Sequence, residues 1–192
     1  MRIGVLALQG DFLEHQTVLE SLSVDSSQVR LPDDLNGLDG LIIPGGESTT
    51  IGKLAVDFNL MDPLRSFAMN HAVWGTCAGS IFLSKDTRRS QPLLGIMDIQ
   101  VDRNAFGRQV DSFEIDLKIP ALAKVSKINP PFHAIFIRAP LIESVTGGAE
   151  SLAELPNGQI VAAIQGKWLA TSFHPELTSD DRFHRFFLEI IR

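Results

Sequence analysis

The only cysteine of the chain, Cys77, stands in the segment 75–79, Gly-Thr-Cys-Ala-Gly. The spacing is that of a nucleophile elbow, G-x-nucleophile-x-G, with cysteine in the position where many hydrolases carry serine. A sharp strand-to-helix turn of this kind lifts the nucleophile above the sheet, and the small flanking residues avoid a clash. The helix N-terminus beneath the sulfur favours the thiolate. We interpret Cys77 as the candidate nucleophile; a structural cysteine beside incidental glycines is the alternative.

A second candidate segment, His174-Pro175-Glu176, directly follows an apolar run. A thiol nucleophile needs a base, and the base needs a group that orients it. The carboxyl end of a strand lies at the edge where open α/β sheets place their sites, so His174 is expected beside Cys77. Glu176 can then accept a hydrogen bond from the ring nitrogen that faces away from the thiol. A solvated surface loop is the alternative for this segment taken alone.

A third segment, residues 44–50, reads Pro-Gly-Gly-Glu-Ser-Thr-Thr between an apolar run and a helix-like pattern. Its glycines allow backbone N–H groups to approach a substrate oxygen closely, so the loop is a candidate oxyanion hole. Lys53 is misplaced for a nucleotide phosphate loop. An ordinary Gly-Gly turn is the alternative.

Two arginines, Arg103 and Arg138, are candidates for binding a carboxylate, although their spacing alone favours surface ion pairs. One cysteine and scattered histidines cannot form a closed zinc site, so we predict no metal site. The remaining histidines are interpreted as structural or solvated residues: His15, His71, His133 and His184.

The elements that must position these residues alternate through the first half of the chain. Strands are expected over residues 2–8, 40–43 and 72–74, with helices beginning at Asp11, Ser48 and Asp62. Glu14, three residues after Asp11, completes a capping-box pattern. This rhythm predicts an α/β fold with a doubly wound, mainly parallel central sheet and flanking helices.

The second half is typical of antiparallel strands added to that sheet. Hairpin signals occur at Asn157-Gly158 and Gly166-Lys167, and a final helix begins near Asp180. The strands are expected over residues 96–101, 110–119, 133–138, 160–165 and 168–173.

Composition limits the class of protein. The chain has 192 residues, 44% of them hydrophobic, and a formal net charge of -6. These values fit a single domain over residues 1–192 and disfavour binding to a phosphate backbone. The apolar runs are too short to span a bilayer, and no export signal is evident. One cysteine excludes a disulfide framework, so we expect a cytoplasmic protein. From the charge and the short apolar runs we expect it to bind neither nucleic acid nor membrane.

The cysteine elbow together with His174-Pro175-Glu176 resembles the class I, triad-type glutamine amidotransferases. Further blocks resemble, within that superfamily, the glutaminase subunits of pyridoxal 5′-phosphate synthase. The blocks are residues 8–10, 44–50, 103–113, 136–140 and 172–178, which span nearly the whole chain.

The resemblance implies the flavodoxin-like fold of that superfamily and a glutaminase reaction. Cys77 would attack the side-chain amide of L-glutamine, and His174 would move the thiol proton to the departing ammonia. Glu176 would orient His174 and balance its charge. Water would then hydrolyse a γ-glutamyl thioester to glutamate. Backbone N–H groups near Gly46 and Ala78 would form the oxyanion hole.

The resemblance also implies binding residues and a partner. The glutamine-binding positions of the family fall on Gly46, Glu47, Ser48, Arg103, Ile137 and Arg138. The glutaminase would dock on a separate synthase subunit, to which ammonia passes and which builds the cofactor from a pentose phosphate and a triose phosphate. Gln9 would lie near that interface and the oxyanion loop, and this chain would hold no cofactor itself.

Other functions compatible with the pattern are kept as alternatives. The chain could serve another synthase, such as that for imidazole glycerol phosphate, although the block 103–113 argues against it. It could also be a non-catalytic scaffold, which the complete set Cys77, His174 and Glu176 argues against. A cysteine peptidase or a stress protein could share the elbow, but the placement of His174-Pro175-Glu176 disfavours that reading.

Overall fold

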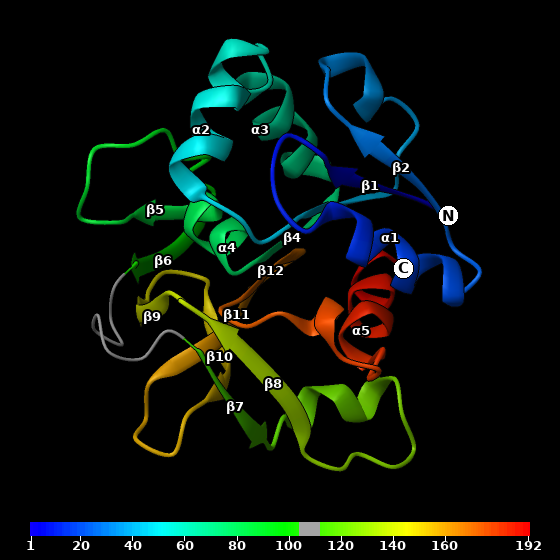
Figure 1. Ribbon diagram of the computed structural model, residues 1–192, viewed down its shortest axis with the longest axis vertical. Coiled ribbons are helices and arrows are strands. Elements are labelled where there is room, and N and C mark those ends of the chain that lie inside the picture. The colour runs from blue at the N-terminus through cyan, green and yellow to red at the C-terminus, as the bar shows by residue number, and fades with distance from the viewer. Residues whose placement is uncertain (104–111) are drawn as a thin grey trace.

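A computed structural model describes residues 1–103 and 112–192 of the chain (Figure 1). Within these residues, ten strands form one sheet in the order β2-β1-β3-β4-β12-β11-β9-β6-β5, with β10 paired to β11. A second sheet consists of β7 and β8. The strands of the large sheet are β1 (Arg2–Leu6), β2 (Asp25–Val29), β3 (Gly40–Ile43), β4 (Ala72–Thr76), β5 (Ser84–Asp86), β6 (Met97–Asp102), β9 (Leu141–Val145), β10 (Glu150–Glu154), β11 (Ile160–Gln165) and β12 (Trp168–Thr171).

The first half of the large sheet is parallel. β2, β1, β3, β4 and β12 are neighbours and all their pairings are parallel. β3 and β4 are fully buried, as expected for apolar strands covered on both faces. Because their carboxyl ends meet at one edge, the loops that follow β1, β3, β4 and β12 converge there.

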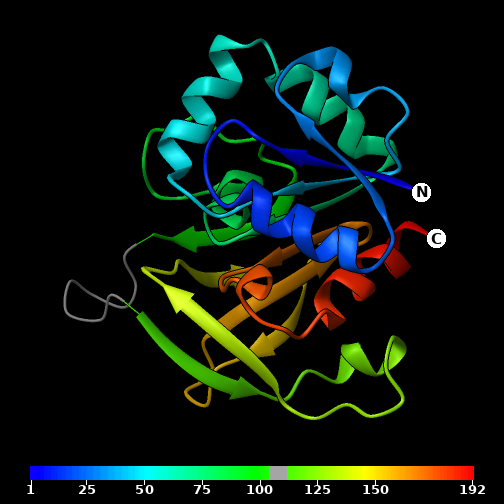
Figure 2. The ribbon, with the colours of Figure 1, turned by 45° about the vertical axis from the view of Figure 1, so that its right-hand side comes forward.

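Helices cover both faces of this parallel region (Figures 1 and 2). One apolar cluster joins the sheet to α2 (Ser48–Asp57), α3 (Met61–Asn70) and α4 (Ala78–Leu83). A second cluster joins the other face to α1 (Phe12–Ser21) and α5 (Arg182–Ile191). The stripe on α5 is core, with Phe183, Phe186 and Phe187 buried. The predicted doubly wound, mainly parallel sheet is confirmed.

The second half adds antiparallel strands, as the sequence predicts. Gly158 joins β10 to β11 and Gly166 joins β11 to β12; both have positive φ, 83° and 57°, and both pairings are antiparallel. β9 pairs antiparallel with β6 and with β11.

The small sheet lies against the second apolar cluster. It consists of β7 (Ser112–Leu117) and β8 (Phe132–Ile137), paired antiparallel, with the 3-10 turn η2 (Pro120–Lys124) between them. Phe132 and Phe136 of β8 contact Phe173, and Phe132 also meets Phe183 edge-on. This packing holds the end of β8 beside the loop that follows β12.

Three helix starts differ from the predicted caps. α3 begins at Met61 with Leu60 at its N-cap, so Asp62 lies inside the helix instead of capping it. The side chain of Asp11 makes no capping hydrogen bond to α1, so the predicted capping box does not form. α2 is capped by Glu47, whose carboxylate accepts from the Thr49 N–H at 3.3 Å, rather than by Ser48. The departures at α1 and α2 lie at the edge where the loops converge, and the carboxylates of Asp11 and Glu47 face other partners described below.

Among the residues described, no helix combines the length and the apolar character needed to cross a membrane.

Candidate active site

Cys77 lies in a sharp turn between β4 and α4, with φ 45° and ψ -107°. A positive φ at a non-glycine residue is strained by about 1–3 kcal/mol and persists only where the surroundings enforce it. Here the Cys77 N–H donates to the Thr171 carbonyl of β12 at 2.8 Å. A Cβ on Gly79 would lie 2.0 Å from the Ile43 carbonyl oxygen, so the flanking glycine is sterically required.

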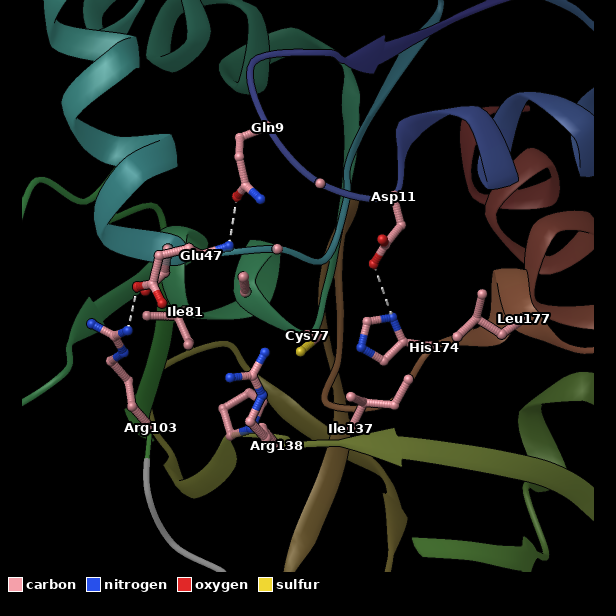
Figure 3. A pocket seen from close by; sticks show the side chains of 15 residues that line it. Gln9, Asp11, Glu47, Cys77, Ile81, Arg103, Ile137, Arg138, His174 and Leu177 are labelled. Carbon is pink, nitrogen blue, oxygen red and sulfur yellow. Dashed lines mark hydrogen bonds and ion pairs between the residues drawn. The ribbon is translucent and has the colours of Figure 1, made fainter. Parts of the chain in front are cut away.

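His174 and Glu176 follow β12 and lie beside this turn (Figure 3). Nδ1 of His174 is 2.7 Å from Oε1 of Glu176, and the Glu176 side chain is fully buried. Pro175 opens the 3-10 turn η3 (Pro175–Leu177), which brings the two side chains onto one side. The His174 N–H donates to the Ile135 carbonyl of β8 at 2.9 Å, which fixes the loop to the small sheet.

The electrostatic surroundings favour a charged His174. Burial lowers its pKa, but the hydrogen bonds and charges of Cys77 and Glu176 outweigh that effect and raise the pKa to about 10. Burial raises the pKa of Glu176, and the hydrogen bond and charge of His174 oppose this. The arrangement therefore favours a protonated His174 beside the Cys77 sulfur near neutral pH.

Asp11, which belongs to none of the sequence motifs predicted to carry chemistry, also faces His174. Its Oδ2 lies 3.5 Å from Nδ1 of His174, so the carboxylate points to the triad instead of capping α1 (Figure 3). Asp11, His174 and Glu176 offer three possible metal-ligand atoms within 4.8 Å of one another. The His174–Glu176 hydrogen bond already explains the closest of these contacts.

The glycine loop after β3 approaches the segment after β1 closely. Gly46 has φ 149°, and a Cβ there would lie 2.5 Å from Oε1 of Gln9. The same Gln9 oxygen accepts a hydrogen bond from the Glu47 N–H at 2.6 Å. A Cβ on Gly45 would meet the His174 ring at 2.5 Å. The loop therefore needs glycine because it passes between Gln9 and the histidine.

A polar network forms the side of the pocket opposite His174. Arg103 binds the Glu47 carboxylate and donates to Oε1 of Gln91 at 3.0 Å, and Gln91 donates to the Ser48 hydroxyl at 3.3 Å. Burial raises the pKa of Glu47, but hydrogen bonds from Thr49 and the charge of Arg103 outweigh it and lower the pKa. No sequence pattern singles out Gln91 as a member of this network.

Arg138 approaches Cys77 from the end of β8 (Figure 3). Its φ of 44° is unusual for a non-glycine residue and turns the chain toward the pocket. Within the described residues it forms no salt bridge, in contrast to Arg103. An exposed guanidinium beside a nucleophile is suited to bind a substrate carboxylate.

One pocket of about 490 Å³ collects these side chains. Every predicted site residue lines it except Glu176, which lies behind His174. Asp11, Ile81, Pro140 and Leu177 also line it, and no spacing rule singled them out. The predicted residues in its lining are Gln9, Gly46, Glu47, Ser48, Cys77, Ala78, Arg103, Ile137, Arg138 and His174.

Part of the block at 103–113 lies outside the described residues. Residues 104–111 belong to that part, so only Arg103, Ser112 and Phe113 of the block are placed. Phe113 stacks on Phe136 with ring centroids 4.4 Å apart, on the small sheet.

A cysteine elbow at the carboxyl edge of a doubly wound sheet, with a His-Glu pair at the end of a neighbouring strand, defines the class of triad-type glutamine amidotransferases. The family model of the SNO glutamine amidotransferases matches residues 5–192. The chain belongs to the SNO glutamine amidotransferase family, and the predicted enzyme class, a glutaminase, is confirmed.

Individual relatives agree with this assignment. A protein of Herpetosiphon aurantiacus named pyridoxal 5′-phosphate synthase subunit PdxT is 56% identical, over 98% of this chain and 99% of its own length. A protein of the same name from Moorella thermoacetica is 55% identical over the full length of both chains. A crystal structure described as a glutamine amidotransferase has a TM-score of 0.91 and 49% identity, over 98% of each chain. The resemblance drawn from the sequence is confirmed.

Proposed function

We propose that this chain is the glutaminase subunit of a pyridoxal 5′-phosphate synthase, with Cys77, His174 and Glu176 as its catalytic residues. The observation that carries the proposal is the pocket itself. It opens on the Cys77 sulfur, with a charged His174 on one side and Arg138 on another. Relatives 56% and 55% identical are named as subunits of that synthase.

The reaction begins with the thiolate–imidazolium pair. The Cys77 sulfur attacks the side-chain amide carbon of L-glutamine, and the carbonyl oxygen becomes an oxyanion. Backbone N–H groups at Gly46 and Ala78 stabilise that oxyanion. The tetrahedral species collapses when His174 donates its proton to the departing nitrogen, which leaves as ammonia and forms a γ-glutamyl thioester.

Hydrolysis reverses the role of His174. The neutral imidazole takes a proton from water, which attacks the thioester carbon. Collapse of the second tetrahedral species breaks the carbon–sulfur bond, releases glutamate and restores the thiolate beside a protonated His174. Glu176, bonded to Nδ1, keeps Nε2 directed at the sulfur and stabilises the imidazolium in both halves of the cycle.

The amino-acid end of glutamine is held by the other walls of the pocket. Arg138 binds the α-carboxylate, because of the two arginines that line the pocket Arg103 is paired with Glu47, whereas Arg138 forms no salt bridge with a described residue. Arg103 neutralises Glu47 and holds it against Ser48 and Gln91. Gly46, Glu47, Ser48 and Ile137 complete the substrate contacts.

The ammonia passes to a separate synthase subunit, which docks near Gln9. The hydrogen bond from the Glu47 N–H to Gln9 connects that surface to the glycine loop. Residues 1–192 act as one glutaminase domain in the cytoplasm. The chain requires no cofactor or metal for this chemistry.

The test is glutamate release from L-glutamine by the chain with and without a pyridoxal 5′-phosphate synthase subunit. Strong stimulation by the synthase is the expected result. Activity that ignores the synthase would assign the glutaminase to another acceptor. No activity in either mixture would contradict the proposal and favour a scaffold.

A further inference from the structure

Two histidines with no part in the proposed reaction lie buried behind the triad, on the side away from the pocket. His15 on α1 and His184 on α5 are both fully buried, and Nδ1 of His15 is 3.0 Å from Nε2 of His184. Each ring meets Trp74 of β4 edge-on, with centroids 5.5 Å and 4.9 Å away. Helices α1 and α5 lie side by side there (Figure 2). Buried polar rings are costly unless they are hydrogen-bonded, so this pair calls for an explanation.

The pair touches the triad through Glu176. One carboxylate oxygen, Oε1, is bonded to His174, while Oε2 is buried and has no hydrogen bond from any described residue. Nε2 of His15 lies 3.4 Å from that Oε2 and 3.2 Å from the hydroxyl of Thr76. An unsatisfied buried carboxylate oxygen carries a large desolvation penalty. A small movement of the His15 ring toward Oε2 of Glu176 would provide the missing hydrogen bond.

The tautomer of each ring follows from the available partners. Nδ1 of His184 is buried without a hydrogen bond from the described residues. If Nδ1 carried the proton, an N–H would be orphaned in the core, and the lone pair of His15 Nε2 would face a carboxylate. If His184 carries its proton on Nε2, it donates to His15 Nδ1, and His15 then presents Nε2–H to Glu176. Orphaned buried N–H groups are rarer than orphaned acceptors, so the second arrangement is favoured.

Both rings are neutral at physiological pH. Burial lowers the pKa of His15, and the charges of His184 and His174 lower it further. Burial lowers the pKa of His184 to about 3, against the opposing charge of Asp181. A neutral donor satisfies the carboxylate without a second positive charge, so the charge of Glu176 stays available to His174. The charged or titratable groups that face Glu176 are His174, His15 and Asp11.

We propose that His15, held in its Nε2–H tautomer by His184, is a positioning residue that donates to Oε2 of Glu176 and fixes the carboxylate against His174. The proposal deepens the proposed function and rests on Glu176 acting through His174. Because His15 also contacts the hydroxyl of Thr76, the residue before the nucleophile, the same ring connects both halves of the triad.

The test uses two substitutions at His15 and a matched control. His15→Gln keeps an amide N–H where Nε2 lies, and His15→Leu removes it. His71→Gln is the control, because His71 lies at the end of α3 and bonds only to the Phe67 carbonyl among the described residues. Cys77 is the only cysteine, so its alkylation by iodoacetamide against pH reports the thiolate–imidazolium pair without glutamine.

The expected result is a change in pH profiles. In His15→Leu the midpoint of the alkylation profile rises by about one pH unit, because a poorly held Glu176 stabilises the imidazolium less. With the synthase subunit present, kcat falls about tenfold, KM stays within about twofold, and the alkaline limb of kcat/KM moves to lower pH. His15→Gln lies between Leu and the wild type, and His71→Gln matches the wild type.

Two results would overturn the proposal. One is a folded His15→Leu whose alkylation profile and alkaline limb coincide with those of the wild type. The other is an equal loss of activity and of melting temperature in His15→Gln and His15→Leu, with no shift in the alkylation profile or in the alkaline limb. A histidine with a purely structural role would give that result. If His15→Leu fails to fold, His15→Gln and His184→Phe provide the same comparison. A wild type that releases no glutamate with its synthase contradicts the proposed function, while the alkylation profiles still decide the role of His15.

Discussion

At the scale of single residues, the site depends on a sulfur held in a strained turn. Cys77 has φ 45°, and its side chain faces the pocket while its N–H is bound by β12 (Figure 3). Backbone contacts fix this geometry, so replacing the Cys77 side chain should alter the chemistry without altering the fold.

Replacement of Cys77 tests this separation. We expect Cys77→Ala and Cys77→Ser to reduce glutamate release with the synthase by about 10³-fold or more, because neither side chain supplies a thiolate. The melting temperature should change little, since both side chains are no larger than cysteine. Retained turnover in a folded variant would remove Cys77 from the mechanism.

The raised pKa of His174 predicts the alkaline limit of the reaction. In the proposed reaction the imidazolium donates a proton to the departing amide nitrogen, and it persists below a pKa of about 10. As pH rises through that value the proton is lost, so kcat/KM should decline on the alkaline side near pH 10 rather than near 6.5. In Glu176→Gln the carboxylate charge is absent, so this limb should move to lower pH. A limb that does not respond to Glu176→Gln would contradict the electrostatic role of the carboxylate.

Arg138 offers a test of substrate binding that is separate from the chemical step. Arg138→Ala should raise KM for glutamine about tenfold or more and leave kcat within about threefold, because a bond to the α-carboxylate is present in both ground and transition states. Lys53→Ala on the exposed side of α2 is a matched loss of positive charge outside the pocket. A fall in kcat alone would show that Arg138 does not hold ground-state glutamine.

At the scale of elements, the sheet depends on glycines that let the elbow approach its neighbours. A Cβ on Gly79 would lie 2.0 Å from a backbone oxygen of β3, which cannot move aside as a side chain can. Gly79→Ala should therefore destabilise the fold by about 1–3 kcal/mol or more, measured by denaturant unfolding. Gly148→Ala is the control, because its Cβ would meet only the Gln165 side chain, at 3.7 Å. Equal stabilities of the two variants would contradict the steric argument.

Elements with a continuous apolar core were predictable from the sequence, whereas polar edge elements were not. β3 and β11 match their expected ranges because both are apolar runs that begin or end at turn residues. β2 reads Asp-Ser-Ser-Gln-Val and was missed, because an edge strand of the sheet needs little apolar surface. Likewise, local spacing assigned caps to Asp11 and Ser48, but tertiary partners turned Asp11 to His174.

The same distinction applies to the site. Cys77, His174 and Glu176 belong to short motifs with a chemical signature, so the sequence singles them out. Asp11 and His15 reach the site from the start of α1, which follows β1, and Gln91 reaches it from the loop between β5 and β6. Their proximity to the site results from tertiary packing and leaves no pattern in the sequence. His15 was accordingly interpreted from the sequence as an ordinary structural or solvated residue.

At the scale of the whole molecule, the loops after β1 and β3 connect the proposed docking surface to the nucleophile. Gln9 accepts from the Glu47 N–H at 2.6 Å, directly after Gly46, which we propose as part of the oxyanion hole. A partner that moves Gln9 therefore changes the position of the loop next to the substrate oxygen. Such a movement of the loop would require no rearrangement of the sheet.

Gln9→Leu separates this coupling from catalysis itself. The leucine has a similar size but cannot accept the Glu47 N–H, so the loop loses its connection to the docking surface. We expect the ratio of glutamate release with synthase to release without it to fall about tenfold, because loss of one hydrogen bond to a positioned N–H is worth about 1–2 kcal/mol. The Cys77 alkylation rate of the isolated chain should stay within about twofold, since the triad does not contact the Gln9 amide in the described contacts. A Gln9→Leu variant that keeps full stimulation would place the coupling elsewhere on the docking surface. One that loses alkylation as well would show that Gln9 supports the triad directly.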